Sequence, residues 1–290
     1  MKFPKIGFGT WQFGGRREPD PNNDDVRDIA AIQAAIKMGL YHIDTAALYA
    51  GGKTEELVGM AAKDFNRARL FIASKVYPKF LSYDDVLQQC ENSLRRLGMD
   101  YLDLYYIHFP NLEIPFEETA RAFNRLRAEG LIKNFGISNA KIETLENYQR
   151  HLDAPFFASQ NSFSLISREA QKTNLVDYCR NKKIHFVAWR PMQLDLPERN
   201  IVSLAKRGAY PMLDKIADKY GKTNAQIAAR WLTQQENVNI IFKSSKPEHI
   251  REILESSDFD LSPEDWKNLS DNFPLQEPIG FDSRGLLPLA

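Results

Sequence analysis

Short apolar segments, rich in β-branched and aromatic residues, alternate along the chain with longer segments whose apolar residues recur at intervals of three and four. The first pattern is typical of buried strands and the second of amphipathic helices. The predicted strands recur about every thirty residues, as expected for successive βα units. They cover residues 5–9, 41–44, 70–75, 102–108, 134–138, 156–161, 185–189 and 239–243.

Several of the segments between these strands carry the usual signals of helix ends. The clearest predicted helices cover residues 25–39, 83–98, 115–130 and 169–182. Three of them end at a glycine that can adopt the left-handed conformation, at Gly39, Gly98 and Gly130. Thr223–Gln226 and Ser245–Glu248 have the residue pattern of capping boxes, and Ser262 followed by Pro263 predicts the start of a last helix.

The alternation predicts an α/β protein, a (β/α)8 TIM barrel rather than an open doubly wound sheet. A barrel of this kind typically has about 250 residues, so residues 1–290 are expected to form one domain with a C-terminal helix and tail. Two segments fall outside the repeat. Residues 190–211 form a long connection, and residues 273–290 form a Pro- and Gly-containing tail expected near the barrel mouth.

Composition excludes some classes of function. Lys plus Arg and Asp plus Glu both number 38, so the net charge is +0 and favours neither nucleic acid nor a membrane surface as partner. Cys90 and Cys179 lie far apart in helical segments, which favours a reducing compartment. The first residues, MKFPKIGFGTW, lack the apolar region of a signal peptide, and a cytoplasmic protein is expected.

Polar residues that can move a proton stand at the ends of three consecutive predicted strands. Asp44 ends the second, Lys75 the third and His108 the fourth, and Tyr49 lies in the loop after Asp44. In a barrel of this type the C-terminal strand ends form the active site. A neighbouring ammonium is expected to lower the pKa of the phenol, and a carboxylate is expected to hold the ammonium. The four residues therefore predict a proton donor with an imidazole beside it.

Taken singly, each of these residues has an ordinary structural explanation. A lone Asp is usually a helix cap, a lone Tyr a packing residue and a lone Lys a surface charge. Their joint occurrence on consecutive strands favours catalysis. The chain has no GxSxG sequence, which argues against a hydrolase that uses His108, and no HxH or HExxH sequence, so no metal site is expected.

In these motifs the chain resembles the aldo-keto reductase family from about residue 5 to 272. The matching segments are GTW at 9–11, DTAALY at 44–49, the Lys of ASK at 75, IHFP at 107–110, GISN at 136–139, SQN at 159–161 and KSS at 243–245. The resemblance implies that Tyr49 is the general acid, that Lys75 and Asp44 tune it, and that His108 positions a carbonyl group. The hydride would come from the nicotinamide of NAD(P)H, and His in place of Glu at 108 implies reduction of carbonyl groups rather than double bonds.

The resemblance also implies a set of cofactor-binding positions. Thr10 and Trp11 would lie near the nicotinamide ribose, Ser138, Asn139 and Gln160 would bind the carboxamide, and Trp189 would stack on the ring. Arg190 replaces a small residue and would lie near either the pyrophosphate or the substrate. The full set on the nicotinamide side is Thr10, Trp11, Asp44, Ser138, Asn139, Gln160, Trp189, Arg190, Pro191 and Met192.

The adenosine end departs from the family pattern. Lys243, Ser244 and Ser245 match the segment that binds the 2′-phosphate of NADPH, and Glu252 matches the acid that binds adenine. His249, however, stands where the family has Arg, and Ile253 where it has Asn. Because a guanidinium is always charged and an imidazole is not, NADPH is expected and NADH stays open as an alternative.

Aromatic residues are expected to line the substrate pocket. Trp11, Tyr49, His108 and Phe109 are the predicted substrate-binding residues, and they favour aldehydes or ketones with apolar or aromatic bodies. The expected partner is thus a small carbonyl compound, and the expected oligomeric state is a monomer. The alternative that stays open is a regulatory subunit that binds the nicotinamide cofactor and has only slow residual reductase activity.

Overall fold

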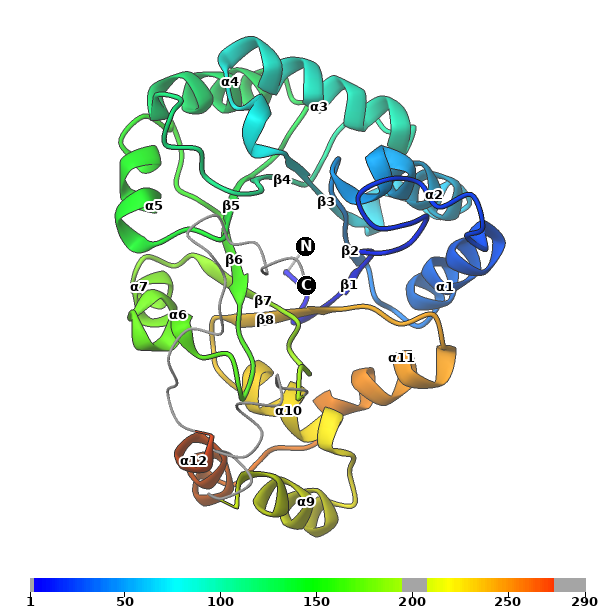
Figure 1. Ribbon diagram of the computed structural model, residues 1–290, viewed down its shortest axis with the longest axis vertical. Coiled ribbons are helices and arrows are strands. Elements are labelled where there is room, and N and C mark those ends of the chain that lie inside the picture. Colours follow the sequence, from blue (N-terminus) through cyan, green and yellow to red (C-terminus); the bar gives the residue numbers. More distant parts are fainter. Residues whose placement is uncertain (1–2, 195–207, 274–290) are drawn as a thin grey trace.

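Eight parallel strands close into a barrel in the computed structural model, which describes residues 3–194 and 208–273 (Figure 1). Each strand pairs with its neighbours in chain order, and β1 pairs with β8 to close the sheet. The predicted (β/α)8 barrel is therefore confirmed. The strands are β1 Ile6–Gly9, β2 His42–Asp44, β3 Phe71–Val76, β4 Leu104–Ile107, β5 Phe135–Ser138, β6 Ala158–Ser162, β7 His185–Trp189 and β8 Val238–Phe242.

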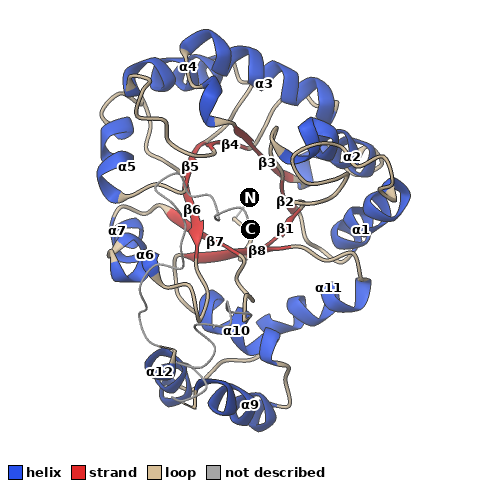
Figure 2. Ribbon diagram, in the orientation of Figure 1, coloured by secondary structure: helices blue, strands red, loops and turns tan. Residues whose placement is uncertain are grey.

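The helices form an outer layer around the strands (Figure 2). Their apolar faces pack on the barrel, as expected for segments with an apolar stripe. They are α1 Asp25–Lys37, α2 Lys53–Ala62, α3 Tyr83–Leu97, α4 Phe116–Ala128, α5 Ile142–Gln149, α6 Glu169–Lys172, α7 Leu175–Asn181, α9 Ala209–Tyr220, α10 Asn224–Thr233, α11 Pro247–Leu254 and α12 Pro263–Asn272. Short 3-10 helices cover Tyr49–Gly52, Arg67–Arg69, Pro78–Phe80 and Glu255–Ser257.

Most predicted helix ends are confirmed. Gly98 ends α3 at a φ of 63°, in the left-handed region where glycine carries no Cβ penalty. Gly39 and Gly130, after α1 and α4, have φ values of 97° and 77°. The capping box at Thr223–Gln226 forms at the start of α10, and the Ser262 hydroxyl accepts from the backbone of Asp265 at the start of α12.

Two predicted elements are wrong in detail. The single helix expected over 169–182 is two helices, α6 and α7, because Asn174 between them takes a left-handed φ of 60°. The capping box expected at Ser245–Glu248 does not form. Helix α11 instead begins at Pro247 after Lys246, whose side chain makes no capping hydrogen bond.

The two segments expected at the mouth lie mostly outside the described residues. Of the predicted connection 190–211, residues 195–207 are not described, and α9 already begins at Ala209. Of the predicted tail 273–290, only Phe273 is described.

Aromatic rings fill the N-terminal end of the barrel. The ring of Phe3 lies 4.8 Å from that of His42, 4.9 Å from Phe71, 5.1 Å from Phe157 and 4.8 Å from His185. Because His42, Phe71 and His185 each begin a strand, this cluster closes the end of the barrel opposite the strand ends that carry the predicted site. The two histidines thus lie away from the mouth.

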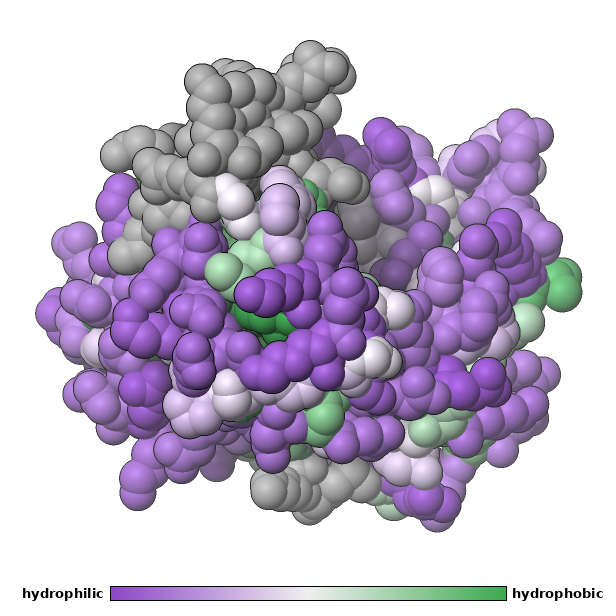
Figure 3. All heavy atoms as spheres, turned by 90° about the horizontal axis from the view of Figure 1, so that it is seen from below, coloured by the Kyte–Doolittle hydropathy of each residue, from purple (hydrophilic) through white to green (hydrophobic). Residues whose placement is uncertain are grey.

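The surface is predominantly hydrophilic on the face drawn in Figure 3. Within residues 3–194 and 208–273, no helix has the length and apolar character needed to cross a membrane. Cys90 and Cys179 are buried and free.

Candidate active site

Four predicted residues meet at the C-terminal ends of β2, β3 and β4. Asp44 is the last residue of β2, Lys75 lies next to the end of β3, and His108 follows β4. The register pairs Asp44 with Ala73, which places Lys75 two residues beyond that pair on the neighbouring strand. Because alternate residues of a strand point to the same face, these side chains project into the barrel mouth.

Tyr49 is held over this mouth by a tight turn. It begins the 3-10 helix Tyr49–Gly52, in which Ala50 has a left-handed φ of 48°. The backbone N–H of Ala50 donates to the carbonyl of Arg16 at 2.7 Å. A non-glycine residue in this conformation is strained, so the contact with the β1–α1 connection helps to fix the Tyr49 backbone.

Lys75 forms a fully buried ion pair with Asp44. The Lys75 Nζ lies 2.5 Å from Asp44 Oδ1, and the two side chains are 0% and 1% exposed. The same ammonium donates to the carbonyl of Thr45 at 2.8 Å and to the Tyr49 hydroxyl at 3.5 Å. Its three protons thus have three acceptors, which is the arrangement a buried charge requires.

The second oxygen of Asp44 accepts a hydrogen bond from the opposite side of the barrel. Gln160 on β6 donates its side-chain amide to Asp44 Oδ2 at 2.8 Å. Thr10, after β1, donates its hydroxyl to the Asp44 carbonyl at 3.0 Å. Sequence reasoning placed both residues only at the cofactor, so their role in holding Asp44 is new. This contact depends on closure of the barrel, which places β2 opposite β6.

The pKa of Tyr49 is raised above that of an ordinary phenol. Burial raises this pKa most, the Lys75 charge lowers it, the Asp44 charge raises it and the hydrogen bond from Lys75 lowers it. The expectation that the ammonium lowers the pKa below its usual value is therefore wrong for the net direction, because burial outweighs the ammonium. Tyr49 keeps its proton at neutral pH.

The pKa of Lys75 is also raised. Burial alone would lower it, but the charges of Asp44 and Tyr49 and the hydrogen bonds to both outweigh that effect. Lys75 is therefore an ammonium when Tyr49 is a neutral phenol. At neutral pH the site therefore holds a protonated phenol, which can donate a proton, beside a fixed positive charge.

His108 presents a neutral imidazole to the mouth. Burial, and then the positive charge of Lys75, hold the pKa of His108 well below its usual value. The His108 ring lies 5.7 Å from that of Tyr49 and stacks on Phe109 at 4.7 Å. In the part of the chain that the structure describes, His108 Nδ1 is buried without a hydrogen-bond partner. A neutral imidazole with a free nitrogen can serve a ligand oxygen or hydrogen.

The residues predicted for the carboxamide adjoin one another on β5 and β6. Ser138 pairs in register with Gln160 and donates its hydroxyl to the Gln160 carbonyl at 2.8 Å. Asn139 donates to the carbonyl of His108 at 3.0 Å and accepts from the Trp189 indole at 3.2 Å. Trp189 thus stands at the end of β7 with its ring anchored to this cluster.

The remaining residues on the nicotinamide side surround these groups. The Arg190 guanidinium lies 5.5 Å from the Trp189 ring, and burial lowers the pKa of Arg190. Pro191 and Met192 follow it in the chain. The ring of Trp11, after β1, meets that of Tyr49 edge to face at 4.9 Å. Together with Phe109, these rings give the mouth an aromatic wall.

The adenosine positions gather where β8 leads into α11. The Lys243 ammonium lies 4.9 Å from the Phe13 ring, and His249 is an exposed third residue of α11. The Ser245 hydroxyl accepts a hydrogen bond from the Arg27 guanidinium at 3.0 Å. Ser244, which lies between Lys243 and Ser245 in the chain, accepts at its hydroxyl a hydrogen bond from the backbone N–H of Lys246. Glu252 accepts from the Thr223 hydroxyl at 2.5 Å.

The contact between Arg27 and Ser245 was not predicted from the sequence. A basic residue in the first turn of a helix opposes the helix dipole, which favours acids there. Arg27 is flanked by Asp24, Asp25 and Asp28, and the exception to that preference was the available signal.

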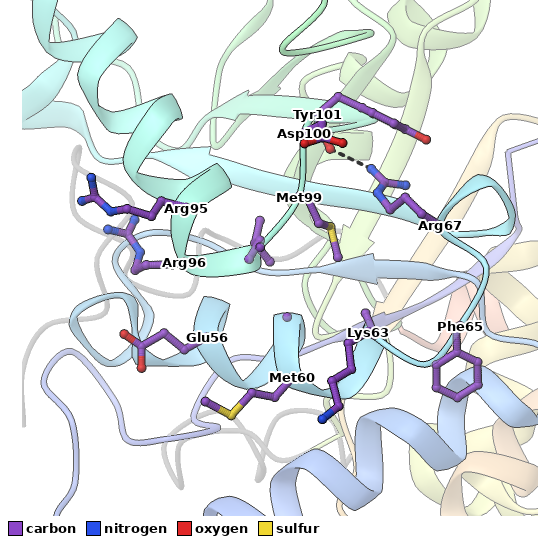
Figure 4. A pocket seen from close by; sticks show the side chains of 14 residues that line it. Glu56, Met60, Lys63, Phe65, Arg67, Arg95, Arg96, Met99, Asp100 and Tyr101 are labelled. Atoms are coloured by element: carbon purple, nitrogen blue, oxygen red, sulfur yellow. Dashed lines mark hydrogen bonds between the residues drawn. The ribbon is translucent and has the colours of Figure 1, made fainter.

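A large surface hollow lies elsewhere, between α2 and α3, and has a volume of about 600 Å³ (Figure 4). Met60 of α2 and Lys63, which follows this helix, face Arg95, Arg96 and Met99 across it. None of the predicted site residues lines it. This hollow is therefore separate from the predicted active site. In residues 3–194 and 208–273 there is also no group of three or more His, Cys, Asp or Glu side chains that could hold a metal ion.

Comparison with known proteins gives consistent matches. Residues 5–271 match the model of the Aldo/keto reductase family. Glyoxal reductase of Bacillus subtilis is 39% identical over 283 residues, which cover 97% of this chain and 92% of that protein. Methylglyoxal reductase YeaE of Escherichia coli is 28% identical over 274 residues, 94% of this chain and 92% of that protein.

Solved structures are similar over nearly the whole chain. The thermostable aldo-keto reductase Tm1743, in complex with the inhibitor epalrestat, has a TM-score of 0.87 and 39% identity, with 93% of this chain and 95% of that chain covered. An aldo/keto reductase from Klebsiella pneumoniae, in complex with NADP and acetate, has a TM-score of 0.82 and 32% identity, with 95% and 93% covered.

Proposed function

Because the chain belongs to the aldo/keto reductase family and is an oxidoreductase of carbonyl compounds, we propose that it uses NADPH to reduce aldehydes or ketones with Tyr49 as proton donor. One observation carries the proposal: the Tyr49 hydroxyl lies 3.5 Å from a buried ammonium, Lys75, which Asp44 fixes at 2.5 Å. A phenol in this setting can release its proton into a site where the resulting negative charge already has a partner.

NADPH, when bound, would supply a hydride for the carbonyl carbon of the substrate. As the C=O double bond becomes a C–O single bond, negative charge develops on the carbonyl oxygen. This oxygen takes the proton of the Tyr49 hydroxyl. Lys75 stabilises the phenolate that remains, and Asp44 keeps the ammonium charged and in position. Tyr49 then regains a proton from solvent, and the products are an alcohol and the oxidised cofactor.

The raised pKa of Tyr49 suits this direction of reaction. Burial keeps the phenol protonated before the step, so the donor is loaded at neutral pH. During the step the negative charge moves from the substrate oxygen toward Tyr49 while Lys75 stays in place. The site therefore favours a proton that leaves only when charge develops on the substrate.

His108 orients the carbonyl group in this proposal. Its pKa lies well below the usual value, so the imidazole is neutral and carries one N–H at physiological pH. A neutral N–H donor directed at the carbonyl oxygen polarises the C=O bond without competing with Tyr49 for proton transfer.

The polar residues on or just after β5, β6 and β8 fit the two ends of the cofactor. Ser138, Asn139 and Gln160 provide hydroxyl and amide groups beside the Trp189 ring, which suits a carboxamide on a flat heterocycle. Lys243 and Ser245 provide a cation and a hydroxyl for the 2′-phosphate, which favours NADPH over NADH. The Klebsiella pneumoniae structure with NADP supports this choice.

The aromatic wall at the mouth suits a small aldehyde or ketone. Trp11, Tyr49 and Phe109 present ring faces and edges, which favours apolar or aromatic bodies next to the reacting carbonyl. The names of two relatives, glyoxal reductase and methylglyoxal reductase, support the inclusion of small dicarbonyl compounds.

The test has two parts. Intrinsic fluorescence titration with NADPH and NADH measures cofactor binding, and a panel of methylglyoxal, aromatic aldehydes and ketones followed at the NADPH absorbance band measures turnover. We expect NADPH binding and consumption that depends on the carbonyl substrate. Tight NADPH binding with no turnover on any carbonyl would instead fit a regulatory subunit, and absence of binding to either cofactor would reject the proposal.

A further inference from the structure

We propose that Arg27, on the first turn of α1, is a ligand of the cofactor 2′-phosphate and sets the preference for NADPH over NADH. This inference rests on the proposed function. The observation behind it is the hydrogen bond from the Arg27 Nη2 to the Ser245 Oγ at 3.0 Å, between residues 218 positions apart in the chain. Helices α1 and α11 lie side by side, which brings this guanidinium to the segment after β8 (Figure 1).

The charges of Arg27 and Lys243 interact with each other. Partial burial lowers the pKa of Lys243, the Asp28 carboxylate raises it, and the Arg27 guanidinium lowers it. The last effect shows that the two cations lie close enough to repel each other. Two adjacent cations repel each other, and a dianion that binds between them stabilises both.

The acids around Arg27 have other partners. Asp24 accepts from the backbone N–H of Arg27 as the helix cap, and Asp25 pairs with Lys53 at 3.3 Å. Asp28 accepts from the Gly14 backbone at 2.9 Å and from the Asn23 amide at 2.8 Å. Within the described residues no carboxylate lies within ion-pair distance of the Arg27 guanidinium, so its charge is open to an exogenous anion.

A positive charge in the first turn of α1 is energetically unfavourable, and a bound anion would offset it. The N-terminal end of a helix carries a partial positive charge, which disfavours a cation in the first turn. Arg27 is exposed there, and its guanidinium donates to the hydroxyl of Ser245. A phosphate at Ser245 would satisfy the guanidinium fork and the hydroxyl together.

The third position of the adjacent helix, α11, has no permanent charge. His249 is exposed at the third position of α11, and in the described part of the chain it makes no hydrogen bond. An imidazole binds a phosphate well only when it is protonated, whereas a guanidinium is charged at every pH at which the protein is folded. Arg27 thus supplies from α1 the permanent charge that position 249 of α11 does not have.

The test measures binding rather than turnover. Dissociation constants for NADPH, NADH, 2′,5′-ADP and 5′-AMP are obtained by fluorescence quenching and calorimetry for the wild type, Arg27→Gln and Arg27→Lys. Arg27→Gln should weaken NADPH and 2′,5′-ADP by about tenfold to a hundredfold, the size of one charge-assisted hydrogen bond, and leave NADH and 5′-AMP unchanged. Arg27→Lys should fall between, because it keeps the charge and loses the fork.

A matched control removes a charge from the other end of the same helix. Lys37 is an exposed residue in the last turn of α1, and Lys37→Gln should leave all four constants unchanged. If Arg27→Gln leaves NADPH binding intact, or weakens NADH equally, the inference is wrong while the proposed function stands. A wild-type protein that binds neither NADPH nor 2′,5′-ADP would reject both.

Discussion

Tyr49 keeps its proton because the protein around it disfavours a phenolate more strongly than Lys75 favours one. In the proposed mechanism the same ammonium is the main partner of the phenolate once the proton has gone. Both effects depend on Asp44, which holds Lys75 at 2.5 Å and is held in turn by Gln160 at 2.8 Å. Removal of the hydroxyl alone should therefore stop the chemistry without disturbing the pair.

The first prediction concerns this hydroxyl. Tyr49→Phe should lower the rate of carbonyl reduction by about 10²–10⁴-fold, the usual effect of removing a general acid, while the dissociation constant of NADPH stays the same. Single-turnover kinetics and fluorescence titration measure the two quantities. Tyr41→Phe, which removes a phenol at the opposite end of β2, is the control and should be fully active. Normal turnover of Tyr49→Phe would exclude Tyr49 as the donor.

The second prediction concerns His108. His108→Ala should lower kcat/KM for carbonyl substrates by about 10²–10³-fold, as for loss of one donor to a developing oxyanion, with NADPH binding unchanged. Because the pKa of His108 lies well below its usual value, the wild-type profile of kcat/KM should show no inflection from this group near neutral pH. A variant with native circular dichroism that fails to bind NADPH would show that His108 acts on the cofactor instead.

At the scale of single residues, the sequence predicted which groups meet but not their net energetics. Asp44, Lys75 and His108 could be placed because strand ends of a parallel barrel share one face. The direction of the Tyr49 pKa could not, because pairwise reasoning counts the ammonium and leaves out the surrounding protein, whose effect is the largest. The bond from Gln160 to Asp44 was missed for a related reason, since it crosses the barrel.

Helix α10 links a local capping signal to the adenosine end of the site. The Thr223 hydroxyl accepts from the Gln226 backbone in the capping box and donates to Glu252 on α11 at 2.5 Å. One side chain therefore starts α10 and holds the acid predicted to bind adenine. Local patterns of this kind are readable from sequence, because the cap and its partner are three residues apart.

The third prediction follows from this double role. Thr223→Ala should lower the free energy of unfolding by about 0.5–2 kcal/mol, the cost of losing an N-cap, and should change the affinity for 5′-AMP because Glu252 loses its partner. Thr223→Ser keeps the hydroxyl and should preserve both quantities. Denaturant unfolding and calorimetry measure them. Equal stability of the Ala and Ser variants would show that the cap contributes nothing.

Where the elements depart from prediction, the cause is a conformation that the residue pattern does not encode. Asn174 divides α6 from α7 by taking a left-handed φ of 60°, although the apolar spacing continues across it. The Ser245–Glu248 pattern fits a capping box, but α11 begins at Pro247 and Ser245 bonds instead to Arg27. That contact joins distant parts of the chain, so no local rule could find it.

Closure of the barrel is what turns separate strand ends into one site. The repeat of βα units predicted it, because eight such units match the strand number of a closed barrel. Closure also creates an opposite end, where Phe3, His42 and His185 pack ring against ring. The sequence pattern gives no indication that His42 would be wholly buried there.

The last prediction concerns the stability of the whole barrel and the burial of His42. Its side chain is 0% exposed, and neither ring nitrogen has a hydrogen-bond partner in the described part of the chain. Burial lowers the pKa of His42 to about 4, although the charge of Asp44 opposes this effect. The folded state therefore resists a proton that the unfolded chain accepts near pH 6.5.

The sign follows from proton uptake. Between about pH 6.5 and pH 4 the unfolded chain binds the His42 proton and the folded barrel does not, so stability is present above this window and falls as pH falls through it. A shift of this size corresponds to roughly 3 kcal/mol at the lower end. His42→Leu should remove this part of the slope, whatever its effect on stability at pH 7. His151→Gln, which replaces an exposed histidine, should leave the slope unchanged. The free energy of unfolding measured in urea at several pH values tests the prediction, and an equal slope in wild type and His42→Leu would show that His42 does not carry the acid sensitivity of the fold.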